Sequence, residues 1–251
     1  MRFFFPQNIF TRLISEHLGE ELNPDISFRP SSVLSGELEK NPDAVGLIPV
    51  MDLINHKEFF VSSKYGISFE NQLSNSYLYY SPEQREIKDI HLFGDISSQE
   101  VILSKLLFKE LYDTVVQIHL VADNNISNKN LIISGDQNFA DNKFIKGVSL
   151  ADEVTESLNL PYVNYIFASN KKEVIEELHS GISGIEERIF NDVEGMNIDE
   201  KLPELSRDYI KSNISSLVVN FDQQDLEGLE QLIRLPYFHA IIESIVEVKY
   251  V

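Results

Sequence analysis

Two amide side chains, Gln7 and Asn8, stand where an apolar segment ends and a helical segment begins. Phe3–Phe5 is typical of a short buried strand, and Pro6 turns the chain after it. Beyond Asn8 the apolar residues recur with the spacing of a helix. Both amides therefore lie where helix N–H groups have no intrahelical partner. Asn8 is suited either to cap this helix or to contact a ligand at its N-terminus.

A second polar group opens the helical stretch that follows residue 96. Ser97 and Ser98 precede Gln99 and the apolar positions of this helix, and serine is a preferred helix cap. The N-terminus of a helix in a cleft also binds carboxylates, so both interpretations stay open. Asp136 follows Gly135 at the end of a short apolar strand, where a turn is the simplest interpretation.

The run from Leu73 to Ser81 places polar residues among large rings. Ser74 and Ser76 precede Tyr77, which begins a series of aromatic residues. This composition suits a strand that lines a cleft, although burial in the core is the default for each ring. Ser76 is interpreted either as a satisfied buried hydroxyl or as a ligand contact.

Several kinds of chemistry are excluded by the residue types that the sequence lacks. It has no cysteine, and therefore no disulfide, thiolate metal site or thiol nucleophile. Its six histidines are scattered without a metal-binding spacing, and the sequence contains no phosphate loop, dinucleotide fingerprint or nucleophile elbow. We expect no metal site and no cofactor.

Charge and hydropathy restrict the partners. Forty acidic residues against 21 basic ones give a formal net charge of −19, which repels phosphate backbones and argues against a nucleic-acid partner. No apolar run reaches the length of a membrane span, and Pro6 interrupts the start of an export signal. We expect a cytoplasmic protein whose partner is a small molecule.

The order of expected elements predicts the fold class. Strand-like segments such as Val45–Val50 alternate with helical ones, which indicates α/β lobes with mainly parallel sheets flanked by helices. Two aromatic strands, near 77–80 and 162–168, bracket a complete strand–helix set. If each crosses between lobes, residues 1–76 and 168–251 form one lobe and residues 77–167 form the other. Ligands favour the cleft between two such lobes.

The order and spacing of several short segments resemble a known family. The sequence is similar to menaquinone-biosynthesis proteins related to chorismate dehydratase, which share the fold of type 2 periplasmic solute-binding proteins. The resemblance is diffuse and spans most of the chain. It rests on the segments Asp43-Ala44-Val45-Gly46-Leu47-Ile48-Pro49, Gly66-Ile67-Ser68, Ser76-Tyr77-Leu78-Tyr79-Tyr80-Ser81, Gly135-Asp136, Leu160-Pro161-Tyr162-Val163 and Asp225-Leu226-Glu227-Gly228-Leu229.

The resemblance implies a cofactor-free lyase that eliminates water from chorismate in the cleft between the lobes. It implies catalytic positions at Asn8 and Ser76, where an amide and a hydroxyl hold the substrate. Neighbouring polar residues are expected to bind the substrate, namely Gln7, Ser74, Tyr77, Ser97, Ser98, Gln99 and Asp136.

Two departures from the family pattern keep an alternative open. Ser97 and Ser98 are followed by Gln99 and Glu100 where the family has further hydroxyl residues. An acid therefore stands where an anion would dock, and like charges about 4 Å apart repel by about 1 kcal/mol in water and by more in a cleft. Phe5-Pro6 replaces the family's Ser-Tyr pair. The alternative is a non-catalytic small-molecule-binding protein of the same fold.

Overall fold

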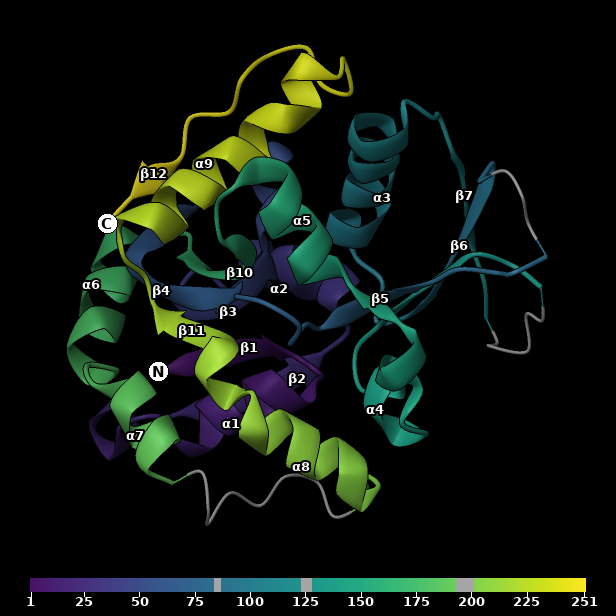
Figure 1. Ribbon diagram of the computed structural model, residues 1–251. Coiled ribbons are helices and arrows are strands. Elements are labelled where there is room, and N and C mark those ends of the chain that lie inside the picture. Colours follow the sequence, from purple (N-terminus) through teal and green to yellow (C-terminus); the bar gives the residue numbers. More distant parts are fainter. Residues whose placement is uncertain (84–86, 123–127, 193–200) are drawn as a thin grey trace.

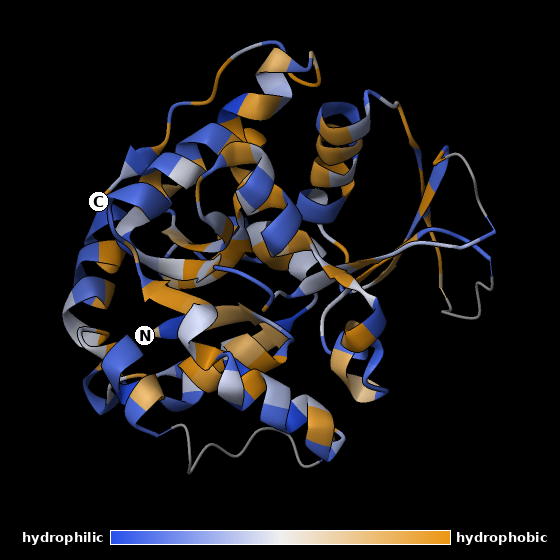
Figure 2. Cartoon of the chain, viewed as in Figure 1, coloured by the Kyte–Doolittle hydropathy of each residue, from blue (hydrophilic) through white to orange (hydrophobic). Residues whose placement is uncertain are grey.

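Two β-sheets with helices packed on them form the framework of the molecule, and each sheet organises one lobe (Figure 1). The computed structural model describes residues 1–83, 87–122, 128–192 and 201–251. The strands at the centre of each lobe are largely apolar, whereas the surrounding helices alternate apolar and polar residues (Figure 2). The two sheets and the helices that flank them confirm the α/β class and the two-lobed arrangement expected from the sequence.

The larger sheet has the strand order β11-β4-β10-β3-β1-β2, with β12 beside β4. Strand β1 pairs in parallel with β2 and β3, whereas β10 pairs antiparallel with β3 and β4. The sheet is therefore mixed rather than mainly parallel. Its strands are β1 (Arg2–Pro6), β2 (Asp25–Arg29), β3 (Ala44–Pro49), β4 (Phe60–Phe69), β10 (Tyr162–Ser169), β11 (Leu217–Asn220) and β12 (Lys249–Tyr250).

The smaller sheet has the order β7-β6-β8-β5-β9 and is also mixed. Strand β6 pairs in parallel with β7 and β8, and β5 runs antiparallel to β8 and β9. Its strands are β5 (Ser76–Tyr79), β6 (Asp89–Gly94), β7 (Gln117–Leu120), β8 (Leu131–Ser134) and β9 (Val148–Ser149).

Helices cover both sheets, and several begin at side-chain caps that the sequence indicates. Ser97 begins α3 with a capping box, Ser149 caps α5, and Asp222 begins α9 with a second capping box. The helices are α1 (Ile9–Glu16), α2 (Leu34–Lys40), α3 (Ser98–Tyr112), α4 (Gln137–Ala140), α5 (Leu150–Leu158), α6 (Lys172–Gly181), α7 (Ile185–Asn191), α8 (Glu204–Ser212) and α9 (Gln223–Phe238).

The chain passes between the lobes twice. The first passage follows β4 and leads to β5, so Ser76 already pairs in the smaller sheet. The second passage lies at residues 159–161, between α5 and β10. Strand β10 pairs with β3 and β4 over its length, so it belongs to the larger lobe. The expected lobe boundary at 167/168 is therefore corrected to the turn before β10, because the aromatic residues of β10 fill the core of the larger lobe rather than a crossing.

The two lobes share one apolar core. The main cluster of buried residues contains Phe5 and Ile166 from the larger sheet together with Leu103, Phe139 and Leu150 from the smaller lobe. A smaller cluster around Ile90 and Phe108 lies within the smaller lobe alone. Helix α8 lies between α7 and β11 in the chain. It also packs on the smaller lobe, where Ser206 donates hydrogen bonds to the Phe139 carbonyl and the Asn142 side chain.

Candidate functional site

The ends of parallel strands from both lobes meet at one junction, and several of the polar residues singled out in the sequence lie there. The carboxyl ends of β1 and β3 lead into helical segments of the larger lobe, and those of β6 and β8 lead into α3 and α4. This is the edge of an open α/β sheet at which ligands bind. Hydrogen bonds of Asp136, Asp95, Asn75 and the Ser98–Gln99 pair cross the junction, whereas those of Asn8 and Glu100 stay within one lobe.

Asn8 is both the cap of α1 and a candidate ligand contact. Its Oδ1 accepts a hydrogen bond from the Thr11 N–H at 3.0 Å, which is the N-cap geometry. The side chain is buried, and its Nδ2 has no hydrogen-bond partner among the described residues. The cap therefore uses only the acceptor of this amide, and the donor remains for another group.

Asp136 binds the N-terminus of α1 from the opposite lobe. Its Oδ1 accepts from the Ile9 N–H at 2.8 Å, and its Oδ2 forms an ion pair with Arg12 Nη2 at 2.6 Å. A helix N-terminus with a nearby guanidinium is a favourable place for a carboxylate. The carboxylate present here belongs to the protein itself.

Asp95 makes the same kind of contact at a second helical start. Ser31 begins the 3-10 turn Ser31–Val33 that leads into α2. Its N–H donates to Asp95 Oδ1 at 2.8 Å, and its hydroxyl donates to Asp95 Oδ2 at 2.6 Å. Burial raises the pKa of Asp95 above that of an ordinary carboxyl, and the Ser31 hydrogen bonds oppose this shift.

Glu100 is a buried carboxyl at the centre of the junction. Ser97 donates to its Oε2 through both N–H and hydroxyl, at 2.9 and 2.7 Å. Ser76 donates to Oε1 at 3.1 Å, and Ser134 donates to the same atom at 3.3 Å. Burial raises the pKa of Glu100, because the charged form loses its hydration. This carboxyl joins the cap of α3 to the first residue of β5.

Asn75 lies on the first passage between the lobes and bonds to both. Its Nδ2 donates to Ser134 Oγ in the smaller lobe and to Tyr165 Oη in the larger, each at 3.1 Å. The residue is buried, and its Oδ1 has no hydrogen-bond partner among the described residues. Asn75 therefore has an acceptor atom without a partner among the described residues, whereas Asn8 has a donor atom without one.

Ser98 and Gln99 hold α3 against the larger lobe. The Ser98 hydroxyl donates to Asp52, and Asp52 also accepts from Ser35. Gln99 accepts from the Met51 N–H at 3.0 Å and donates to the Val163 carbonyl at 3.2 Å. Burial raises the pKa of Asp52, and its two serine partners oppose the shift.

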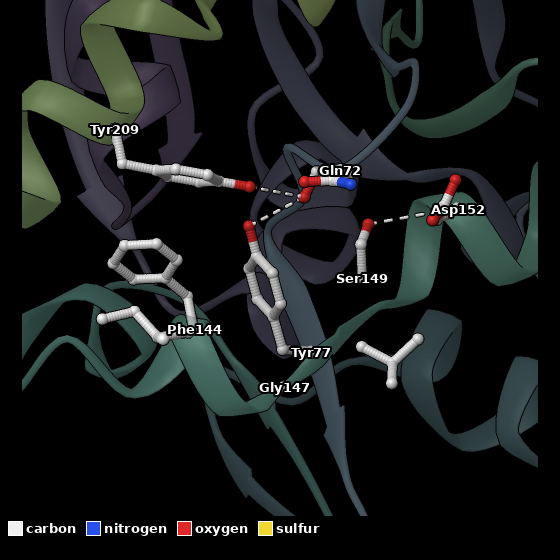
Figure 3. A pocket seen from close by; sticks show the side chains of 9 residues that line it. Gln72, Tyr77, Phe144, Gly147, Ser149, Asp152 and Tyr209 are labelled. Atoms are coloured by element: carbon white, nitrogen blue, oxygen red, sulfur yellow. Dashed lines mark hydrogen bonds between the residues drawn. The ribbon is translucent and has the colours of Figure 1, made fainter.

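The remaining candidates lie in three different environments. Gln7 is exposed at the start of α1. Ser74 is buried and accepts from the Ser76 N–H at 3.2 Å, which shapes the turn before β5. Tyr77 points to the face of β5 opposite Ser76, because neighbouring residues of a strand alternate faces. Its hydroxyl donates to the Gln72 carbonyl at 3.0 Å in a separate pocket (Figure 3).

Sequence reasoning identified the segments of this junction and missed some of its residues. The sequence pattern indicates Glu100 only as an obstacle to an anion, whereas the structure shows that it accepts hydrogen bonds from three serine residues. Asp95, Ser31 and Asn75 were not singled out. Ser31 begins a 3-10 turn and Asp95 lies two residues before the cap of α3, so both residues stand near a detectable helix start. Asn75, between Ser74 and Ser76, has no local signal of its own.

Among the described residues no helix is long and apolar enough to cross a membrane. One group of side chains has atoms close enough to hold a metal ion, namely Glu39, His56 and Glu58. Both glutamates are exposed, and the group lies outside the junction.

No protein-family model and no curated protein matches the sequence. Solved structures match over nearly the whole chain. Protein AF1704 from Archaeoglobus fulgidus is 13% identical and covers 96% of this chain and 98% of its own, with a TM-score of 0.67. The periplasmic aliphatic sulphonate binding protein SsuA from Escherichia coli is 11% identical and covers 99% and 95%, with a TM-score of 0.62.

A third structure is the Candida albicans CA3427 gene product, which is described as having the generic periplasmic binding protein fold. It is 9% identical and covers 97% of this chain and 91% of its own, with a TM-score of 0.61. These similarities show that the chain has the fold of periplasmic binding proteins, as the sequence predicted.

Proposed function

We propose that this protein binds a small molecule at the junction between its lobes, next to Asn8 and Asn75. The proposal is carried by two buried amide atoms at the junction, Asn8 Nδ2 and Asn75 Oδ1, which have no hydrogen-bond partner among the described residues. A buried polar group without a partner costs about 1–3 kcal/mol, and natural proteins keep few such groups. A ligand that accepts from Asn8 and donates to Asn75 would recover this cost.

The charges at the junction favour a neutral polar ligand. The two helical N-termini that would bind an anion already hold Asp136 and Asp95, and the buried Glu100 lies close by. A dicarboxylate would have to displace both aspartates from their N–H partners. A neutral molecule with a donor and an acceptor needs no such displacement, and the net charge of −19 repels anions further.

Thermal stability with added solutes tests the binding proposal. We expect at least one neutral polar solute, from a panel of sugars, polyols and amides, to raise the melting temperature of the wild type. Asn8→Ala and Asn75→Ala should remove this shift. Asn170→Ala is a matched control, because Asn170 bonds to the Leu38 carbonyl away from the junction. The proposal fails if no member of the panel shifts the wild type, or if the control removes the shift equally.

An elimination of water from chorismate is the second candidate, and Glu100 is the observation that favours it. Such a reaction breaks a C–H and a C–O bond, and the proton and hydroxyl leave together as water. Burial raises the pKa of Glu100, so this carboxyl holds a proton more readily than an ordinary one and can serve as the acid or base. Ser76, bonded to Glu100, would position it, and the Asn8 amide would orient a substrate hydroxyl or carboxylate.

Incubation with chorismate, without any cofactor, separates the two candidates. The lyase predicts that chorismate is consumed and that Glu100→Gln slows this by about 10²–10⁴-fold, the usual contribution of a positioned acid or base. Glu110→Gln is the control, because Glu110 is exposed on the same helix. A wild-type protein that leaves chorismate untouched rules out the lyase and leaves the binding proposal in place.

A further inference from the structure

A pocket lies on the face of β5 that Tyr77 occupies, away from the junction. Its volume is about 410 Å³, and α8, the first interlobe passage and the start of α5 surround it (Figure 3). Its walls include Gln72, Tyr77, Phe144, Ser149, Asp152 and Tyr209. Nothing in the proposed function uses this pocket.

The aromatic wall of the pocket is held in place by contacts between the lobes. The rings of Phe144 and Tyr209 stack with centroids 4.2 Å apart and planes 29° apart. Ser206, one turn before Tyr209 on α8, donates to the Phe139 carbonyl at 2.6 Å and to Asn142 at 2.7 Å. The Tyr209 ring is therefore positioned before any ligand arrives.

The hydroxyl protons at the pocket are already used. Tyr77 and Tyr209 both donate to the Gln72 carbonyl oxygen at 3.0 Å, and Figure 3 shows the two hydroxyls converging on it. Ser149 donates to the Asn71 carbonyl at 3.3 Å and accepts from the Asp152 N–H at 3.2 Å. Since a hydroxyl has one proton, the tyrosine oxygens offer a ligand only lone pairs.

The charge of the pocket is negative. Asp152 supplies a carboxylate, and none of the described residues that line the pocket is Lys, Arg or His. Asp152 and Tyr209 line the same pocket. Burial raises the pKa of Tyr209, the hydrogen bond with Tyr77 lowers it and the charge of Asp152 raises it. A site with acceptor oxygens, a carboxylate and aromatic rings is complementary to a cation that carries N–H donors and apolar carbon.

We propose that this pocket binds a protonated organic amine. The ammonium group donates hydrogen bonds to Asp152 and to the tyrosine oxygens, and the carbon skeleton packs on Phe144, Tyr209 and the exposed Ile145. The net charge of −19 raises the local concentration of such cations at low ionic strength.

Three probes with one carbon skeleton test the proposal by titration calorimetry on the full chain at low salt. We expect 2-phenylethylammonium to bind at least tenfold more tightly than 2-phenylethanol, in which a hydroxyl replaces the ammonium. Phenylacetate, with the opposite charge, should not bind measurably. Equal binding of the alcohol and the amine would overturn the proposal, and so would the absence of amine binding.

Variants locate the site. Asp152→Asn keeps the size of the side chain and should weaken amine binding at least tenfold, whereas Glu156→Gln removes one exposed charge from the same helix and should change it less than twofold. Tyr209→Phe keeps the ring, removes one acceptor and should weaken binding about threefold.

An unchanged affinity in Asp152→Asn would contradict the proposal, and so would equal losses in Asp152→Asn and Glu156→Gln. Asn75→Ala should leave amine binding intact, so this result is independent of the junction site.

Discussion

Glu100 shows how one residue serves a local and a long-range purpose at once. With Ser97 it forms the capping box that begins α3, an arrangement specified within four consecutive residues. Its other oxygen accepts from Ser76 and Ser134, which belong to different strands of the smaller sheet. The capping box alone would leave the side chain at the surface. Packing between the lobes buries it.

Two substitutions of Glu100 should differ in their effect on stability, because one removes the hydrogen-bonding group and the other keeps it. Glu100→Ala removes the acceptor of an N–H and three hydroxyls in a buried place and should lower the free energy of unfolding by about 3 kcal/mol or more. Glu100→Gln can still accept from Ser97 and can donate toward Ser76 and Ser134, so we expect a loss of about 1 kcal/mol. Urea unfolding of both variants measures the difference, and equal losses would contradict this account.

At the scale of elements, helix α9 approaches the second interlobe passage closely. A Cβ added at Gly228 would lie 2.5 Å from the Pro161 carbonyl oxygen. Glycine is normally a weak residue in a helix interior, and here it permits contact between the helix and a backbone segment that links the lobes. The close contact therefore requires glycine at position 228, although helix propensity alone would favour alanine.

Two glycine-to-alanine substitutions should therefore have different effects on the free energy of unfolding. Gly228→Ala forces α9 away from Pro161 and should destabilise the protein by about 2 kcal/mol, although alanine is favoured in helices by about 1 kcal/mol. Gly36→Ala in α2 meets no atom within 4 Å and should be neutral or stabilise by up to about 1 kcal/mol. Chemical unfolding checks both, and a stabilised Gly228→Ala would refute the close approach.

Helix α8 supplies a second test at this scale, because it ties the lobes together. Ser206 is buried and donates to the Phe139 carbonyl and to Asn142. Ser206→Ala should lower the free energy of unfolding by about 1–2 kcal/mol. Ser212→Ala at the exposed end of α8 is the matched control and should change it by less than about 0.5 kcal/mol. Equal effects of the two substitutions would show that the contact with the smaller lobe contributes nothing.

For the whole molecule, buried carboxyls make stability depend on pH in an uncommon direction. Burial raises the pKa of Asp52, Asp95 and Glu100 at the junction. The folded state then binds protons more tightly than the unfolded chain, so stability decreases as the pH rises from the ordinary carboxyl range through the raised values. His179 opposes this below neutral pH, because burial lowers its pKa to about 4.

A comparison of wild type with Asp95→Asn isolates one carboxyl from this balance. The amide does not titrate, whereas the Asp95 carboxyl takes up a proton more readily in the folded state. The difference in unfolding free energy should therefore shift in favour of the wild type as the pH falls through the raised pKa of Asp95 toward the ordinary carboxyl range. Urea unfolding at several pH values measures this difference. A difference that stays constant, or that moves toward the variant, would contradict the raised pKa.

Local patterns in the sequence determined the elements. Alternation of strand-like and helical segments indicated the two-lobed α/β fold, and Ser97 indicated a helix start that the structure confirms. Such signals depend on residues a few positions apart, whose geometry the helix or strand itself imposes. The acidic composition likewise follows from the sequence alone.

Which polar groups contact each other depends on the packing of the two lobes. The Ile9 N–H and Asp136 are 127 positions apart in the chain, and Asn75 and Tyr165 are 90 apart. No local pattern relates such residues, because their contact depends on how two sheets twist and how two passages bring the lobes together. The same reason explains why β10 was placed on a crossing and lies in the larger sheet instead: the residues that flank a strand do not reveal which sheet completes its hydrogen bonds.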